Sequence, residues 1–278
     1  MPATIDRMSL ADLDTVLDWA ANEGWNPGLD DASAFLAADP DGFLIRKLAG
    51  RPVSAISVVN HSDSFAFLGL YLCHPDFRGH GHGLTIWRAG LAHAGGRTIG
   101  LDGVPAQEAN YARSGFIRHG GAARFTAECD LARAGATRPV LTADIPALLE
   151  REMRTTGIDA SRFHDAWFRD TPTRRTLLLE DAHGLAGYGT VRACRVGTKI
   201  GPFHARDEKT AGLLLGDLAA TFDARAVSLD VPQAAIGLRS LLEGAGFRPS
   251  FSTARMYKGA PPPSRPDGFR SVATLELG

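Results

Sequence analysis

Residues 75–83 read Pro-Asp-Phe-Arg-Gly-His-Gly-His-Gly, and they follow an apolar run over 65–72 and precede an amphipathic segment over 84–94. The first segment predicts a strand and the second a helix. Glycines let a backbone turn tightly and bring its N–H groups close to a ligand. The unpaired N–H groups and the dipole at a helix start attract anions such as a pyrophosphate. The stretch therefore predicts a phosphate-binding loop that opens a helix.

Other interpretations of this loop fit less well. A Walker A loop is excluded because no Gly-Lys-Ser/Thr follows, and a dinucleotide-binding loop lacks the acidic residue that contacts a ribose after the next strand. His80 and His82 invite a comparison with metal sites, but they alternate within a loop and no third ligand is evident. We interpret both histidines as solvent-facing or phosphate-adjacent and expect no metal.

The sequence predicts a similar order of elements twice. The first half predicts a helix, three strands, a helix, a strand, a helix and a strand, over residues 9–21, 43–46, 52–59, 65–72, 84–94, 98–101, 106–114 and 123–129. The second half repeats this order with one strand fewer, over residues 142–155, 176–180, 187–193, 213–222, 226–229, 234–244 and 271–277. A repeat near half the chain length predicts two tandem α/β domains, at 1–132 and 140–278, with the join at 133–139.

A second motif closes the first half, Asn-Tyr-Ala-Arg-Ser-Gly-Phe over residues 110–116. Tyr111 stands one turn before a capping Gly-Phe pair, so its side chain points back toward the preceding strand end. A phenol in that position could donate a proton to a departing thiolate. Taken alone, Tyr111 is better explained as a packing residue. Its combination with the glycine-rich loop favours the proton donor.

Together these motifs resemble the GNAT N-acetyltransferase superfamily, and the whole chain resembles its tandem-domain bacterial members. In the second half, the resemblance is carried by Lys-Ile-Gly-Pro-Phe at 199–203, Leu-Asp-Val-Pro at 229–232 and Arg-Met-Tyr-Lys-Gly at 255–259. The resemblance implies two domains, each with a mixed sheet covered by helices on both faces and splayed between its fourth and fifth strands. It also implies acetyl-CoA as co-substrate.

The resemblance further assigns roles to single residues. It implies that Tyr111 is the general acid and that the backbone of Leu72, Cys73 and His74 pairs with the pantetheine arm. It also places at the cofactor the residues of the pyrophosphate-binding loop and the neighbour of Tyr111. These are Arg78, Gly79, His80, Gly81, His82, Gly83, Leu84 and Asn110.

The acceptor side is less defined by the sequence. Acetyl transfer to an amine needs the amine neutral, so a general base is expected. The candidates are Glu23, just after the first helix, and Asp102, at the end of the strand over 98–101, with His74 as a third. The resemblance places Trp25 and Asn26, together with Glu23, at the acceptor pocket. Glu23 as a solvated helix-end carboxylate and Asp102 as a helix cap are equally consistent with the sequence.

The second copy lacks the residues that grip and react in the first. When the copies are aligned on their proline-containing loops, Gly81 falls opposite Glu208, and a carboxylate there would repel a pyrophosphate. Tyr111 falls opposite Leu242, which has no proton to give. We therefore expect the second domain to be degenerate. Lys199, together with His204 and Arg206, could mark a residual binding site or an ordinary solvated surface.

Composition sets the outer limits of these expectations. The chain has 278 residues, 30 Lys and Arg against 31 Asp and Glu, and 44% hydrophobic residues, so neither nucleic acid nor a membrane is an expected partner. Its three cysteines, Cys73, Cys129 and Cys194, are far apart, which fits a reducing compartment. With neither a secretory signal nor an apolar run near the ~20 residues of a membrane span, we expect a cytoplasmic protein, monomeric or homodimeric.

The sequence thus predicts an N-acetyltransferase that moves the acetyl group of acetyl-CoA to a primary amine of a small molecule or amino-acid-like acceptor, by direct attack in a ternary complex. The alternative is a non-catalytic acyl-CoA-binding sensor or interaction module. A longer acyl group is a third possibility.

Overall fold

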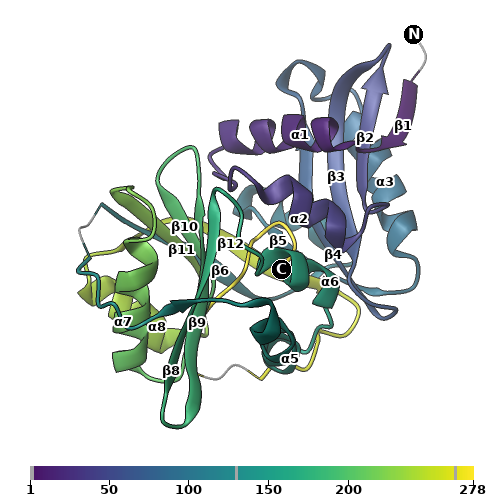
Figure 1. Cartoon of the computed structure of the whole chain (residues 1–278). Coiled ribbons are helices and arrows are strands. Elements are labelled where there is room, and N and C mark those ends of the chain that lie inside the picture. Colours follow the sequence, from purple (N-terminus) through teal and green to yellow (C-terminus); the bar gives the residue numbers. More distant parts are fainter. Residues whose placement is uncertain (1–2, 129–130, 266–267) are drawn as a thin grey trace.

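The computed structural model describes residues 3–128, 131–265 and 268–278, and its strands form one mixed sheet that runs through the whole molecule (Figure 1). The order along this 13-stranded sheet is β1-β2-β3-β4-β5-β12-β6-β11-β10-β9-β8-β7, and β13 pairs with β10 off this path. Helices lie on both of its faces. This arrangement confirms the predicted α/β fold with a mixed sheet.

The first copy begins with a well-capped helix. Ser9 Oγ accepts a hydrogen bond from the Asp12 N–H at 3.2 Å, and the Asp12 carboxylate accepts one from the Ser9 N–H at 3.1 Å, so α1 starts at Leu10. The elements of this copy are, in chain order, β1 (Ala3–Arg7), α1 (Leu10–Asn22), α2 (Asp31–Ala38), β2 (Phe43–Leu48), β3 (Arg51–Asn60), β4 (Phe65–Cys73), α3 (His82–Ala94), β5 (Thr98–Gly103), α4 (Glu108–Arg113) and β6 (Ile117–Glu128).

The second copy repeats this order and then adds a tail. Its elements are β7 (Arg138–Pro139), α5 (Ile145–Thr156), α6 (Ser161–Trp167), β8 (Arg174–Asp181), β9 (Gly184–Ala193), β10 (Thr198–Ala205), α7 (Glu208–Ala219), β11 (Ala226–Pro232), α8 (Ile236–Gly244), β12 (Arg248–Lys258) and, in the tail, β13 (Phe269–Ser271). The segment before β7 is held to α7, because the Asp217 carboxylate accepts hydrogen bonds from four successive backbone N–H groups, at 134–137.

Three sequence predictions need correction. The last strand, predicted over 271–277, is wrong: β13 ends at Ser271 and the chain then turns, with Gly278 N–H donating to Thr274 O at 3.1 Å. The helix predicted to begin at residue 213 begins at Glu208, because Asp207 caps it. The pattern also missed six elements, namely β1, α2, β7, α6, β10 and β12. The predicted strand over 123–129 lies within β6, except that Cys129 is outside the described residues.

The two copies exchange their last strands. In each copy β6 or β12 follows the short helix α4 or α8, but β12 of the second copy pairs with β5 of the first, and β6 of the first copy pairs with β11 of the second. The exchanged strands also pair with each other. The sheet order is therefore nearly palindromic about β12 and β6, and the sheets of the two copies are continuous.

Each exchanged strand carries an arginine that closes the exchange. Arg124 of β6 stands opposite Asp230 of β11, and its Nε and Nη2 donate to the two carboxylate oxygens at 2.8 and 2.9 Å. Arg255 of β12 stands opposite Asp102 of β5, with distances of 2.8 and 2.6 Å. Bidentate pairs of this kind combine charge with fixed geometry. Each exchanged strand is thus bound to the other copy by an equivalent arginine–aspartate ion pair.

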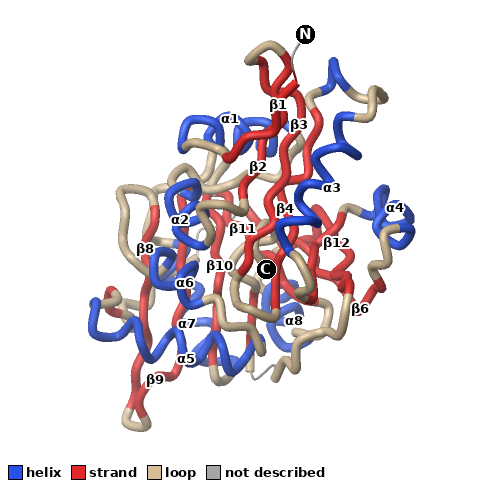
Figure 2. The backbone as a smooth tube through the Cα atoms, turned by 90° about the vertical axis from the view of Figure 1, so that its right-hand side faces the viewer, coloured by secondary structure: helices blue, strands red, loops and turns tan. Residues whose placement is uncertain are grey.

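The core continues across the junction of the two copies. On one face of the sheet, α1 and α2 of the first copy pack into the same buried cluster as α5 and α6 of the second. On the other face, α3 and α4 cover the first copy and α7 and α8 the second, each pair in a cluster of its own (Figure 2). Helices α1, α2, α5 and α6 therefore join the copies into one packed unit.

Candidate active site

The first copy opens between β4 and β5. These strands pair in parallel from Phe65 with Thr98 to Leu68 with Leu101, and the pairing then stops. Directly after this point the backbone of Leu70 has a positive φ of 43°, and the register of β4 against β3 shifts. Such a bulge bends a strand away from its neighbour. The bulge thus leaves a gap between the ends of β4 and β5, where the family resemblance implies a splay.

Beyond the gap, the glycine-rich loop turns into α3. A short 3₁₀ helix over Pro75–Phe77 leads into it, and Gly79 and Gly81 have φ of 81° and 79°, which side chains disfavour. Gly81 is the N-cap of α3, and no side chain caps the helix. A Cβ built on either glycine would meet open space. The loop is therefore an uncovered helix start, as a diphosphate-binding site requires.

Both loop histidines lie at the surface of this turn. His80 is exposed, and the half-buried His82 accepts a hydrogen bond from Arg46 Nε to its Nδ1 at 3.2 Å. Burial, followed by the positive charge of Arg46, lowers the pKa of His82. Within the described part of the chain, no group of three or more His, Cys, Asp or Glu residues is arranged to hold a metal ion.

Arg78 links the loop to the end of α1. Its guanidinium forms an ion pair with Glu23, and its Nε donates to Cys73 O at 3.0 Å. Both partners are partly exposed and line the same pocket. Arg78 therefore lines the pocket beside the end of β4, and its ion pair holds Glu23.

Tyr111 is buried beside the gap. Its ring stacks on Trp87 of α3, with 5.6 Å between ring centroids, and its residue is 7% exposed. A Cβ at Gly103 would come within 2.4 Å of the Tyr111 ring, so β5 needs a glycine at this point to make room for it. Burial raises the pKa of Tyr111 to about 12, which keeps its phenol protonated. Asn110 lies on the exposed side of α4 and bonds to Gln107 and Arg113.

Arg78, Tyr111 and the ends of β4 and β5 line a pocket of about 360 Å³, whereas the glycine-rich loop from Gly79 onward lies outside its lining. Its walls come from the end of α1, from β4 and β5, from α4, from both exchanged strands and from the C-terminal tail. Its lining includes Glu23, Trp25, Tyr71, Leu72, Cys73, Arg78, Asp102, Tyr111, Arg124, Phe251, Thr253, Leu275 and Glu276. Small-molecule sites commonly begin at about 300 Å³.

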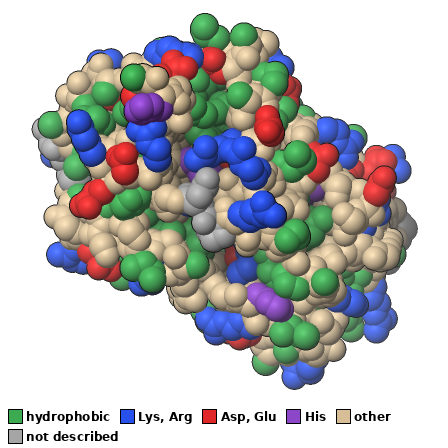
Figure 3. All heavy atoms as spheres, turned by 90° about the horizontal axis from the view of Figure 1, so that it is seen from below, with side chains coloured by type: hydrophobic (Ala, Val, Ile, Leu, Met, Phe, Trp, Pro, Cys, Tyr) green, Lys and Arg blue, Asp and Glu red, His purple; other side chains and the backbone are tan. Residues whose placement is uncertain are grey.

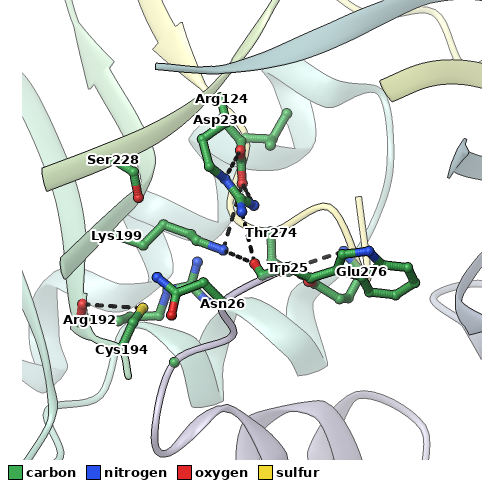
Figure 4. A network of polar contacts seen from close by, with 12 residues as sticks. Trp25, Asn26, Arg124, Arg192, Cys194, Lys199, Ser228, Asp230, Thr274 and Glu276 are labelled. Carbon is green, nitrogen blue, oxygen red and sulfur yellow. Dashed lines mark hydrogen bonds and ion pairs between the residues drawn. The ribbon is translucent and has the colours of Figure 1, made fainter. Parts of the chain in front are cut away.

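The remaining sequence candidates fall into different positions. Trp25 lines the pocket, and its carbonyl accepts hydrogen bonds from Arg124 and Lys199, each at 2.9 Å (Figure 4). The Asn26 side chain instead bonds to the backbone of Val196 in the turn between β9 and β10, so it belongs to the contact between the copies.

Two other candidate bases are engaged elsewhere. The Asp102 carboxylate lines the pocket, but both of its oxygens accept from Arg255. The ring of His74 packs edge-on against Trp19 and Phe77, away from the lining of the pocket. Asp102 is thus held in an ion pair, and His74 lies outside the lining of the pocket.

Sequence reasoning missed the pocket residues that come from the second half. Phe251 and Thr253 arrive on the exchanged strand β12, and Leu275 and Glu276 arrive on the tail. No local pattern in the sequence signals either route. One signal for the strand exchange is the Leu-Asp pair that occurs in both β5 and β11. An aspartate in a buried strand needs a cationic partner, which a strand from elsewhere in the chain must then supply.

In the second copy the equivalent gap is filled by the chain itself. Here β10 and β11 pair only from Thr198 to Ile200, and β13 then runs antiparallel to β10. Val272, just after β13, donates its N–H to Asp230 O of β11 at 3.0 Å. The tail thus bonds to both strands of the gap and occupies the space between them.

The start of α7 is also occupied. Asp207 is its N-cap, and its side chain accepts from the Thr210 N–H at 2.8 Å. Because Gly81 and Asp207 are the N-caps of their helices, Asp207 is the structural counterpart of Gly81. The sequence alignment puts Glu208 there, so it is off by one residue, but the expected carboxylate opposite Gly81 is present. Phe116 N–H donates to Tyr111 O and Phe247 N–H to Leu242 O, which confirms that Leu242 is the counterpart of Tyr111.

The basic residues near this second gap are not a solvated patch. Lys199 and His204 are 2% exposed. Lys199 bonds to Trp25 O in the network between the copies, and burial lowers its pKa (Figure 4). His204 lies 3.4 Å from Glu152. Arg206, at the surface, pairs with Asp181. We therefore correct the interpretation of these three residues as one surface group.

The outer surface carries mixed charge. On the face seen in Figure 3, basic, acidic and apolar side chains are interspersed, as a net charge of −1 leads one to expect. None of the described helices is both long enough and apolar enough to cross a membrane.

Two family models match the chain, one for each copy. Residues 10–120 match the acetyltransferase (GNAT) family, and residues 149–268 match an acetyltransferase (GNAT) domain. GNAT proteins use acyl-CoA as co-substrate. The uncovered helix start and the open gap of the first copy fit that ligand.

Similar proteins extend this match over nearly the full length. The chain is 29% identical over 273 residues to holothin acyltransferase from Pseudoalteromonas sp. (strain SANK 73390), covering 97% of this chain and 92% of that one. A protein from Pyrococcus horikoshii assigned to the acetyltransferases has a TM-score of 0.80 at 20% identity, covering 99% and 96% of the two chains. A tandem GNAT protein of the clavulanic acid biosynthesis pathway has a TM-score of 0.60 at 18% identity, covering 93% and 99%. At these identities the two structures show the fold alone. The chain belongs to the GNAT acyltransferases, as a member with two GNAT domains in tandem.

Proposed function

We propose that this enzyme transfers the acetyl group of acetyl-CoA to a primary amine of a small molecule, by direct attack in a ternary complex at the pocket of the first copy. One observation carries the proposal: the open strand gap and the buried Tyr111 line a pocket that Arg78 joins to the uncapped helix start at Gly81, and the described part of the second copy has neither an open gap, an uncapped glycine helix start nor this tyrosine. The relative named for acylating holothin supports a small-molecule acceptor.

In this site different residues would bind the cofactor and supply the proton. The N–H groups from Gly79 to Leu84, with Arg78, would hold the diphosphate, and the β4 backbone at Leu72 and Cys73 would face the pantetheine arm. Tyr111, protonated because burial raises its pKa to about 12, would supply the proton for the leaving thiolate.

A thiol-release assay tests this function. The full-length protein is mixed with acetyl-CoA and a panel of primary amines, and free CoA and the N-acetylated product are measured together. We expect stoichiometric product and CoA with at least one amine. Tight binding of acetyl-CoA without amine-dependent CoA release across the panel would contradict the proposal and favour a sensor. Competing propionyl-CoA and hexanoyl-CoA against acetyl-CoA determines the acyl group.

A further inference from the structure

The C-terminal tail connects the two strand gaps. After filling the gap of the second copy as β13, it crosses to the first copy and ends against β4. A Cβ at Gly201 would lie 2.3 Å from Val272 O, and a Cβ at Gly69 would lie 2.1 Å from Glu276 O. Both glycines stand next to the bulge of their strand. The tail therefore packs tightly on the backbone of both copies.

Polar contacts fix the tail between these two glycines. Arg192 Nη2 donates to Ala273 O at 3.3 Å, and His61 Nε2 donates to Leu277 O at 2.9 Å. Burial lowers the pKa of His61 to about 4, so its ring is neutral at physiological pH. Thr274, 1% exposed, hydrogen-bonds through its hydroxyl to the Glu276 carboxylate (Figure 4). The tail is therefore an ordered part of the pocket wall, and these contacts position Glu276.

Glu276 differs from the other carboxylates of the pocket. It is 5% exposed and lines the pocket that contains Tyr111. Glu23 is paired with Arg78, and both oxygens of Asp102 are taken by Arg255. Among the residues that the structure describes, Glu276 forms no ion pair, and its one hydrogen-bond partner is the Thr274 hydroxyl. Burying a carboxylate that forms no ion pair costs free energy, and a cationic ligand in the pocket would offset that cost.

The charged groups that face Glu276 are Arg124 of β6 and Lys199 of β10. Burial opposes the charge on Arg124, but Asp230 and, to a lesser degree, Glu276 raise its pKa. Arg124 is held by both oxygens of Asp230, and the Nζ of Lys199 donates to Trp25 O. Both cations are therefore bound to other partners, and Glu276 lines the pocket without an ion pair among the described residues.

We propose that Glu276 is the general base of the first copy and accepts the proton of the acceptor ammonium. This assignment rests on the proposed function. An alkylamine reaches the pocket protonated at neutral pH. Glu276 takes one proton and passes it to solvent, and the neutral nitrogen forms the amide bond as the carbon–sulfur bond breaks. Tyr111 protonates the thiolate and is reprotonated by the second proton of the nitrogen.

The test compares Glu276→Gln with the wild type and with Glu243→Gln, which changes an exposed carboxylate of α8. Glutamine keeps the size of the side chain and can still bond to Thr274. We expect kcat/KM for the best amine of the panel to fall about 10²-fold or more at pH 7. The deficit should shrink as pH rises toward the pKa of the amine, because solvent then supplies the neutral nucleophile. Acetyl-CoA affinity and melting temperature should stay near wild type, as in Glu243→Gln.

Three outcomes would overturn the assignment. The first is a Glu276→Gln enzyme as active as wild type at pH 7. The second is a loss of activity that is the same at every pH. The third is a loss that comes with weaker acetyl-CoA binding or a lower melting temperature, which would make Glu276 a structural residue. In all three cases the wild type still acetylates amines, so the proposed function stands. If the wild type acetylates none, that function fails first.

Discussion

The two strand gaps of this molecule start from the same geometry and end in opposite states. In both copies the parallel pairing stops after a few residues and a bulge turns one strand away. In the first copy the gap opens into a pocket, whereas in the second β13 fills it. A splayed sheet is therefore not by itself a ligand site, because its open backbone groups can equally be satisfied by another segment of the chain.

The helix starts next to the gaps differ in the same direction. Gly81 leaves the start of α3 uncapped, while Asp207 places its own carboxylate on the start of α7. The buried phenol of Tyr111 has the aliphatic Leu242 as its counterpart. The open gap, the uncapped helix start and the buried phenol are thus present in the first copy and absent from the described residues of the second. The second copy instead contributes an exchanged strand and the tail to the lining of the first copy's pocket.

The largest expected effect is on stability and concerns the two buried ion pairs of the exchanged strands. Arg124→Ala and Arg255→Ala should each lower the free energy of unfolding by about 3–5 kcal/mol, because each leaves a buried aspartate without its cation. Guanidinium unfolding, followed by two spectroscopic probes, measures this. Both variants should still unfold in one transition, since the exchange joins the copies.

A surface pair serves as the control for that experiment. Arg169→Ala breaks the exposed pair with Asp165 and should cost less than about 1 kcal/mol. If one buried pair proved no more important than this surface pair, or if the transition split in two, the copies would not form a single unit.

The next effect is on turnover and compares matched substitutions at Tyr111 and Leu242. Tyr111→Phe should lower kcat about 10²-fold and leave acetyl-CoA affinity nearly unchanged, because only the hydroxyl is lost. Leu242→Met, at the matched position, should leave kcat unchanged. Steady-state kinetics up to pH 10 should show no alkaline loss from Tyr111, since burial raises its pKa to about 12. Unchanged turnover in Tyr111→Phe would remove its role as acid.

The smallest effect concerns the cap of the second copy. Asp207→Ala should lower stability by about 1 kcal/mol, the usual cost of a lost N-cap. Acetyl-CoA binding should not change, because β13 still occupies the neighbouring gap. Thermal unfolding and calorimetric titration measure the two quantities. A second binding event in this variant would mean that Asp207, and not β13, is what closes the second copy.

Local motifs made half of the site predictable. The glycines at 79 and 81 and the tyrosine at 111 are recognised within their own segments, because helix starts and caps depend on neighbouring residues. The strand exchange and Glu276 left no such signal. Arg255 and Asp102 are 153 residues apart, and the tail reaches the pocket only after crossing the second copy. Local patterns predict a base at Glu23, Asp102 or His74, and in the structure the first two are paired with Arg78 and Arg255.

Calorimetric titration of acetyl-CoA onto the full-length protein tests the central claim, that only the first copy has a working cofactor site. We predict one molecule bound per chain. Binding should be lost in Gly81→Asp, which gives α3 the carboxylate that α7 has at Asp207 and which a left-handed backbone tolerates in aspartate. Two molecules per chain in the wild type, or undiminished binding in Gly81→Asp, would contradict this account.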